Sequence, residues 1–120
     1  MAPKKYLVDL SQIDMNVVLA DQEAIANFNP QRFEMAQITA LVYENLEDHT
    51  CVGYKDVGEQ DFWVRGHFPE IPLMPGVIML EAIAQCCSLF CQRNDLLGAE
   101  MLGLGGLEEV RFRGAVVPGD

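Results

Sequence analysis

A single histidine lies in a stretch rich in proline and glycine. Prolines at positions 69, 72 and 75 follow His67; they restrict the backbone and remove amide donors. We therefore expect a rigid, irregular loop that holds the imidazole in place. Gly76 comes next, at the start of a predicted helix, where free N–H groups and the positive end of the helix dipole can stabilise a developing oxyanion.

A carboxylate follows inside the same predicted helix. Glu81 stands five residues after Gly76, which is about 7.5 Å along a helix axis, and its neighbours are apolar. We expect it to be buried, and burial favours the neutral form of a carboxyl group, which suits a proton donor. Gln85 lies one turn later on the same face and can hydrogen-bond to Glu81. On spacing alone, a structural role for His67 and Glu81 is as well supported as acid/base catalysis.

One long helix and several strands must position these groups. Residues 77–94 are apolar on almost every face, which predicts a helix buried all round. Residues 20–28 predict a short helix within an N-terminal arm of residues 1–28. Strands are expected at residues 37–47, 51–57, 62–64 and 107–117, the first three as an antiparallel meander. The sequence therefore predicts one α+β domain over residues 1–120.

Charge and composition exclude several classes of function. The net charge of -10, from 18 acidic and 8 basic residues, argues against nucleic acid or an anionic membrane as the main partner. Polar residues at positions 9, 12 and 14 interrupt what would be the apolar part of a signal peptide, so we expect a cytoplasmic protein. The four cysteines lack the spacing of a zinc site and are expected to be buried, reduced thiols, with no metal bound.

The loop and helix resemble a known family. Gly-His-Phe-Pro at 66–69, Pro72, Pro-Gly-Val at 75–77 and the Glu-Ala and Ala-Gln pairs of 81–85 are similar to the 3-hydroxyacyl-[acyl-carrier-protein] dehydratases of bacterial fatty-acid synthesis, the FabZ type. The likeness runs from about residue 29 to the end, through the segments 30–33, 109–113 and 116–120. The FabA type, which also isomerises the double bond, carries Asp at the position of Glu81 and Cys at that of Val77, so this chain resembles the dehydratase-only type.

The resemblance implies the hotdog fold, a long central helix wrapped by an antiparallel sheet. In the family, further strands follow the Pro-Gly-Asp turn at 118–120, and these C-terminal strands lie outside this sequence. The resemblance also implies a homodimer, with a trimer of dimers as the alternative. Each of its active sites takes the histidine from one subunit and the carboxylate from the other, and the acyl chain runs in a tunnel.

The resemblance also implies the reaction and its residues. A (3R)-hydroxyacyl thioester on acyl carrier protein would lose water to give the trans-2-enoyl thioester, without metal or organic cofactor. His67 would remove the C2 proton and Glu81 would protonate the departing hydroxyl. The N–H of Gly76 would bind the thioester oxygen, and the remaining substrate-binding positions would be Val77, Phe68 and Gln85.

An acidic carrier protein requires a local basic patch on this acidic chain. Arg111 and Arg113 alternate along the predicted strand 107–117, so we expect both side chains on one face, available for carrier docking. Two other functions remain open on the same fold. One is a non-catalytic subunit that binds acyl groups or a longer relative, and the other is an acyl thioesterase.

Overall fold

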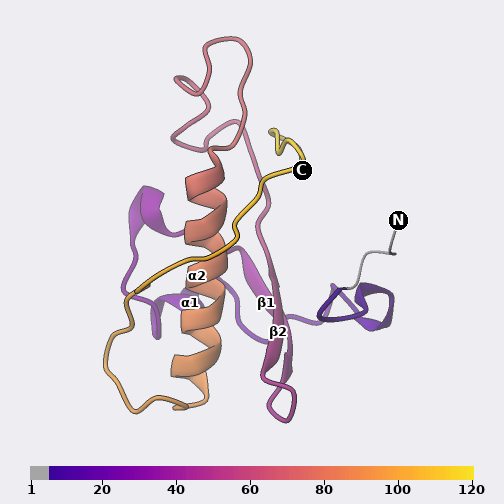
Figure 1. Ribbon diagram of the computed structural model, residues 1–120, viewed down its shortest axis with the longest axis vertical. Coiled ribbons are helices and arrows are strands. Elements are labelled where there is room, and N and C mark those ends of the chain that lie inside the picture. Colours follow the sequence, from indigo (N-terminus) through magenta and orange to yellow (C-terminus); the bar gives the residue numbers. More distant parts are fainter. Residues whose placement is uncertain (1–5) are drawn as a thin grey trace.

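The computed structural model describes residues 6–120, so the part of the predicted N-terminal arm at residues 1–5 lies outside the described residues. Its longest element is the helix α2 (Gly76–Arg93), close to the predicted 77–94. A hairpin of two antiparallel strands, β1 (Ala40–Asn45) and β2 (Thr50–Tyr54), lies along one side of α2 (Figure 1). The predicted α+β class and the first two predicted strands are therefore confirmed.

Short helical turns complete the N-terminal half. They are η1 (Leu10–Gln12), α1 (Gln22–Ala26) and η2 (Phe33–Met35). The helix predicted at residues 20–28 is α1, which begins after Asp21 because that carboxylate accepts a 2.9 Å hydrogen bond from the amide of Ala24. A bridge between Ala20 and Leu41 ties the residue before α1 to β1.

The end of α2 is fixed to the hairpin by polar side chains. Glu44 on β1 forms an ion pair with Arg93, in the last turn of α2. The side chain of Asn94 donates to the same carboxylate at 3.0 Å and to the carbonyl oxygen of Phe90 at 2.9 Å. A cation near the helix C-terminus and a partner for an otherwise free carbonyl group both stabilise the end of the helix.

Two apolar clusters form the core. The first lies between α1, the hairpin and α2, and its buried members are Ala20, Ile25, Ile38, Leu41 and Leu89. The second lies near the start of α2, and its buried members are Val57, Trp63 and Met74. No helix within residues 6–120 has the length and apolar character needed to cross a membrane.

Three predictions about these elements are wrong. Residues 62–64 form turns instead of a third strand, although Trp63 is only 3% exposed. Residues 107–117 form no regular strand, and most of them are exposed. Finally, α2 is not buried all round: Val77 and Ile83 are 68% and 60% exposed. The hairpin and α1 cover only part of the helix surface, so part of its apolar surface stays exposed.

The chain after α2 returns along the helix. In Figure 1 it loops out beyond the end of α2, crosses the helix and finishes near the opposite end. Backbone hydrogen bonds fix this return: the amide of Met74 donates to Val116 O at 2.8 Å, and the amide of Val57 donates to Asp120 O at 2.9 Å. The C-terminal residues thus lie beside the loop that precedes α2.

Candidate active site

The loop before α2 holds His67 by three hydrogen bonds, two through its backbone and one through its ring. Its amide donates to Trp63 O at 2.8 Å, and its carbonyl oxygen accepts from the amide of Leu73 at 2.7 Å. The ring atom Nδ1 lies 2.7 Å from Leu73 O. Because a carbonyl oxygen can only accept, this contact assigns the proton to Nδ1 and leaves the lone pair of Nε2 free to act as a base.

Further contacts make the same loop rigid, as its prolines predict. The amides of Phe68 and Ile71 each donate to the carbonyl oxygen of the other at 2.9 Å. The ring of Phe68 stacks on the imidazole, with 4.1 Å between the centroids and 26° between the planes. Phe68 therefore supports His67 directly, and since its side chain is 51% exposed it also presents an apolar surface beside the base.

The first residue of α2 lies against an aromatic ring, which would have to shift to admit a side chain there. A Cβ atom on Gly76 would lie 2.8–2.9 Å from the ring of Phe112, which packs against the start of the helix. The amide of Gly76 belongs to the first helical turn, where N–H groups have no acceptor within the helix. Val77, the next predicted substrate-binding residue, points away from the core and is 68% exposed.

Glu81 lines a cavity of about 500 Å³ between α2 and residues 97–107. Its carboxylate accepts a 2.8 Å hydrogen bond from Nε2 of Gln85, one turn later, as predicted. The expected full burial is wrong, since Glu81 is only partly buried in this chain. The cavity side of the carboxyl group stays accessible, which a group that must exchange protons with a ligand requires. Most other residues around the cavity are apolar, among them Leu80, Ile83, Leu102, Leu104 and Leu107.

Gln85 is a buried hydrogen-bonding centre. It is 2% exposed, and its Nε2 donates to Met35 O at 2.7 Å as well as to Glu81. Its Oε1 accepts from the amide of Gln37 at 2.8 Å. Both N–H bonds and the oxygen are thus used within the protein, which supports a role in positioning the Glu81 carboxylate; the contact of Gln85 with substrate stays a prediction.

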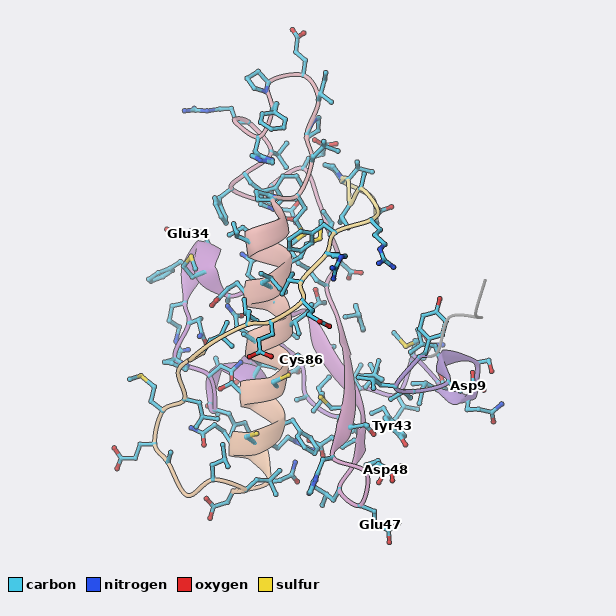
Figure 2. The ribbon with its side chains drawn as sticks, viewed as in Figure 1. Asp9, Glu34, Tyr43, Glu47, Asp48 and Cys86 are labelled. Carbon is cyan, nitrogen blue, oxygen red and sulfur yellow. The ribbon has the colours of Figure 1, made fainter. Side chains whose placement is uncertain are left out.

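The segment that bonds to Gln85 runs along a different side of the helix from the hairpin. Figure 2 shows Glu34 to one side of α2 and Tyr43 of β1 to the other, with Glu47 and Asp48 at the tip of the hairpin. The helix is therefore held on two sides near its middle, at the level where Gln85 orients Glu81.

The chain does not bring all the predicted site residues together. Glu81 and Gln85 line the large cavity, whereas His67, Phe68 and Gly76 do not. His67 belongs to the loop that extends beyond the N-terminal end of α2, at the top of Figure 1. A single chain thus contains two separate parts of the predicted site.

The structure does not support the reason for placing the two arginines proposed for carrier docking on one face. Arg111 and Arg113 are both exposed, but residues 107–117 form no strand, so strand alternation does not place them on a common face. Neither forms an ion pair with any described residue, since the ion pairs within residues 6–120 are Lys55–Asp61 and Glu44–Arg93. Both remain available to an acidic partner.

The cysteines are free thiols, three of them on α2. Sγ of Cys51 on β2 lies 3.8 Å from Sγ of Cys86 on the helix. This hydrogen bond and burial raise the pKa of Cys51, and the same hydrogen bond lowers the pKa of Cys86 because it stabilises the thiolate. The expected burial of the thiols is wrong for Cys87, which is exposed, and the other three are only partly buried; partial desolvation still raises the pKa of Cys87. Within residues 6–120, no cluster of His, Cys, Asp and Glu side chains is arranged to hold a metal ion.

Comparison with known proteins identifies the family. Residues 29–120 match the FabA-like domain. The chain belongs to the FabA-like family. This membership, together with the long helix and the antiparallel strands, confirms the expected hotdog class, of which α2 and the β1–β2 hairpin are described here.

Three relatives of this FabA-like chain share the name FabZ. It is 34% identical over 101 residues to the 3-hydroxyacyl-[acyl-carrier-protein] dehydratase FabZ of Sinorhizobium fredii, covering 84% of this chain and 65% of that protein. The FabZ of Rhizobium rhizogenes is also 34% identical over 101 residues, with 84% and 64% covered. For the FabZ of Clostridium botulinum the identity is 34% over 100 residues, with 83% and 69% covered. The chain therefore spans slightly less than two thirds of the length of the two rhizobial relatives.

Sequence reasoning missed the other amides around the FabA-like cavity. Gln31 lines it beside Glu81, and Gln37 bonds to Gln85 through its backbone. The available signal was the two glutamines Gln31 and Gln37 in a segment that must pack on α2. Buried amide groups need hydrogen-bond partners, so such residues indicate a polar network beside the helix.

Proposed function

We propose that this protein dehydrates (3R)-3-hydroxyacyl groups on acyl carrier protein to trans-2-enoyl groups, as a hydro-lyase of fatty-acid biosynthesis acting in the cytoplasm. The observation that carries the proposal is the pairing of Glu81 with Gln85 at the wall of an acyl-sized cavity. A base with a defined tautomer, His67, is present in the same chain. The relatives named FabZ support the same reaction class.

The chemistry requires two proton transfers. Nε2 of His67 takes the proton from C2, which is acidified by the neighbouring thioester. Glu81 gives its proton to the C3 hydroxyl, the C3–O bond breaks, and water leaves as the C2–C3 double bond forms. His67 is then protonated and Glu81 ionised, and proton exchange with water restores the starting state.

Charge develops on the thioester oxygen as the C2 proton leaves. The amide of Gly76 in the first turn of α2 is the proposed donor to that oxygen, because the helix dipole and a free N–H group both favour negative charge there. The exposed Val77 and Phe68 then provide apolar contacts for the substrate near the base.

We propose that a complete site needs two copies of the chain. His67 and Glu81 lie in separate parts of one chain, and a two-fold interface would bring the histidine loop of one subunit to the Glu81 cavity of the other. The exposed apolar face of α2, with Val77 and Ile83, supplies a surface for such contact. The assembly would be a homodimer or a trimer of dimers.

The carrier would dock by charge. Acyl carrier protein is acidic, and the free arginines at positions 111 and 113 are the proposed contacts.

The direct test is hydration of crotonyl thioester, followed as loss of enoyl absorbance. Wild-type protein should turn over, whereas His67→Ala and Glu81→Gln should each lose about 10²–10⁴-fold in kcat, the usual contribution of general acid/base catalysis. Unchanged activity in both variants would refute the assignment. Release of free thiol would instead indicate a thioesterase, and saturable binding of the thioester without turnover would indicate an acyl-binding subunit.

A further inference from the structure

A second cavity lies behind the first. It has a volume of about 230 Å³ and is formed by α1, residues 29–38 and Gln85. Two residues, Gln31 and Gln85, line both cavities. The two spaces therefore share a wall that includes Gln31 and Gln85, and the side chain of Gln85 holds the carboxylate of Glu81.

Three buried amide oxygens belong to residues that line this second cavity. They are Oδ1 of Asn29, Oε1 of Gln31 and Oε1 of Gln37, and none accepts a hydrogen bond from any residue between 6 and 120. Asn29 and Gln37 are 3% and 1% exposed, so bulk water does not satisfy these oxygens. A buried acceptor without a partner costs about 1–3 kcal/mol.

Hydrogen bonds of the amide nitrogens fix which atom is the free one. Nδ2 of Asn29 donates to Gln85 O at 3.0 Å, and Nε2 of Gln37 donates to Glu34 O at 2.6 Å. Reversing either amide would break that bond and place oxygen against oxygen. Both residues therefore offer acceptors, and the natural occupant of the cavity is a hydrogen-bond donor.

That donor is neutral and small. No residue that lines the second cavity is charged, so nothing there balances an ammonium group or a metal ion, and an unpaired buried charge is far more costly than a polar neutral group. A water molecule needs roughly 10–15 Å³ of such a cavity and two to four polar partners. The second cavity, with its volume of about 230 Å³, therefore has room for several water molecules.

We propose that this cavity takes up the water molecule released at Glu81 and carries it away from the site, and that Gln31 is the gate. The proposal rests on the dehydratase function proposed above. The hydroxyl oxygen, one proton from Glu81 and the hydroxyl hydrogen leave together as water. An acyl chain in the mostly apolar first cavity would block departure on that side, so the free acceptors of the second cavity provide the other route. In the reverse direction the same cavity delivers the attacking water.

Gln31 suits the role of gate because its backbone is fixed while its side-chain oxygen is free. The guanidinium group of Arg32 donates to the carbonyl oxygens of Asn29, Gln31 and Ala26, at 2.6, 2.9 and 2.8 Å. Gln85 is held by three side-chain hydrogen bonds. Rotation of the Gln31 side chain is therefore the smaller movement that joins the two cavities.

The test compares two variants that act on the route in different ways. Gln31→Leu removes the acceptor at similar volume, and Ala26→Leu fills the second cavity while Gln31 stays. Each should lower kcat about tenfold for dehydration and for hydration, with KM within twofold and the equilibrium ratio unchanged. Gln60→Leu, an exposed glutamine that lines neither cavity, is the matched control and should match wild type.

A crystal structure at high resolution gives a second, direct measurement. Ordered waters should lie within hydrogen-bonding distance of Asn29 Oδ1 and Gln37 Oε1. If either variant fails to fold, as judged by circular dichroism, the other variant and these waters test the proposed water route. If wild type is active and the folded variants have kcat values within twofold of it, the water route is overturned but the proposed function is not. A cavity without ordered water has the same consequence. A wild type without any dehydratase or hydratase activity overturns the proposed function and the route with it.

Discussion

Replacement of Gln85 by leucine should lower the free energy of unfolding, because it removes a network of hydrogen bonds at the centre of the molecule. Leucine has a similar volume but none of the three side-chain hydrogen bonds, which reach the amide of Gln37, the carbonyl oxygen of Met35 and the carboxylate of Glu81. The main-chain carbonyl of Gln85, which accepts from Asn29, is retained. The variant therefore isolates the side-chain network.

The expected loss follows from burial. The amide of Gln37 is left without a partner in a residue only 1% exposed, which costs about 1–3 kcal/mol. Loss of the bond to Met35, a residue 42% exposed whose carbonyl group water can reach more easily, adds about 1 kcal/mol. The sum is about 2–4 kcal/mol, a decrease in Tm of roughly 10 °C for a domain of this size.

Urea unfolding followed by far-UV circular dichroism measures this free energy. The matched control is Gln92→Leu on the same helix, a partly buried glutamine whose side chain makes no hydrogen bond with residues 6–120, and it should change stability by about 0.5 kcal/mol or less. Equal stability losses in the two variants would refute the reasoning, because they would mean that the network around Gln85 contributes nothing of its own.

Two further predictions concern charge and thiols. Reversal of charge at Arg111 and Arg113 should raise KM for an acyl-carrier substrate about tenfold and leave KM for a small acyl thioester unchanged; equal KM values for the carrier substrate would exclude docking there. Cys51→Ala removes the donor that lowers the pKa of Cys86, so the midpoint of the pH profile for alkylation of Cys86, measured by peptide mass spectrometry, should move to higher pH. A midpoint that stays or moves down would contradict the assigned hydrogen bond.

The elements that the sequence predicts well are those specified by local signals. Asn94 and the break after it end α2 as expected, and the strand-like residues on either side of the 46–49 turn form the hairpin. The bond between Glu81 and Gln85 also follows from helix geometry alone, because side chains four residues apart face each other. Rigidity of the His67 loop follows from its prolines.

Elements that depend on distant partners were predicted badly. Residues 107–117 have strand-like composition, but a strand needs a neighbouring strand, and in the described chain this segment finds none. Aromatic content at 62–64 reflected the burial of Trp63 in the core and not extended structure. The apolar face of α2 gave no information on whether the same chain or another covers it, so the burial of Glu81 was overestimated.

The buried amides could not be assigned from the sequence for a related reason. Asn29 and Gln31 look like ordinary loop residues, and Gln37 like the first residue of a strand, until the fold packs their segment against α2. Only then do the side-chain nitrogens of Asn29 and Gln37 find carbonyl partners, which leaves their oxygens for the second cavity. Polar residues of this kind acquire a role through contacts 48 to 56 positions apart in the chain.

Mixing two inactive variants tests the proposed sharing of the active site between subunits most directly. His67→Ala and Glu81→Gln proteins, mixed in equal amounts, dissociated and allowed to reassociate, should recover about a quarter of wild-type hydratase activity: half of the dimers are mixed, and each mixed dimer contains one intact site. Each variant alone should stay inactive under the same treatment. A mixture no more active than its components, with exchange of subunits verified by mass spectrometry, would contradict a site in which His67 and Glu81 come from different chains.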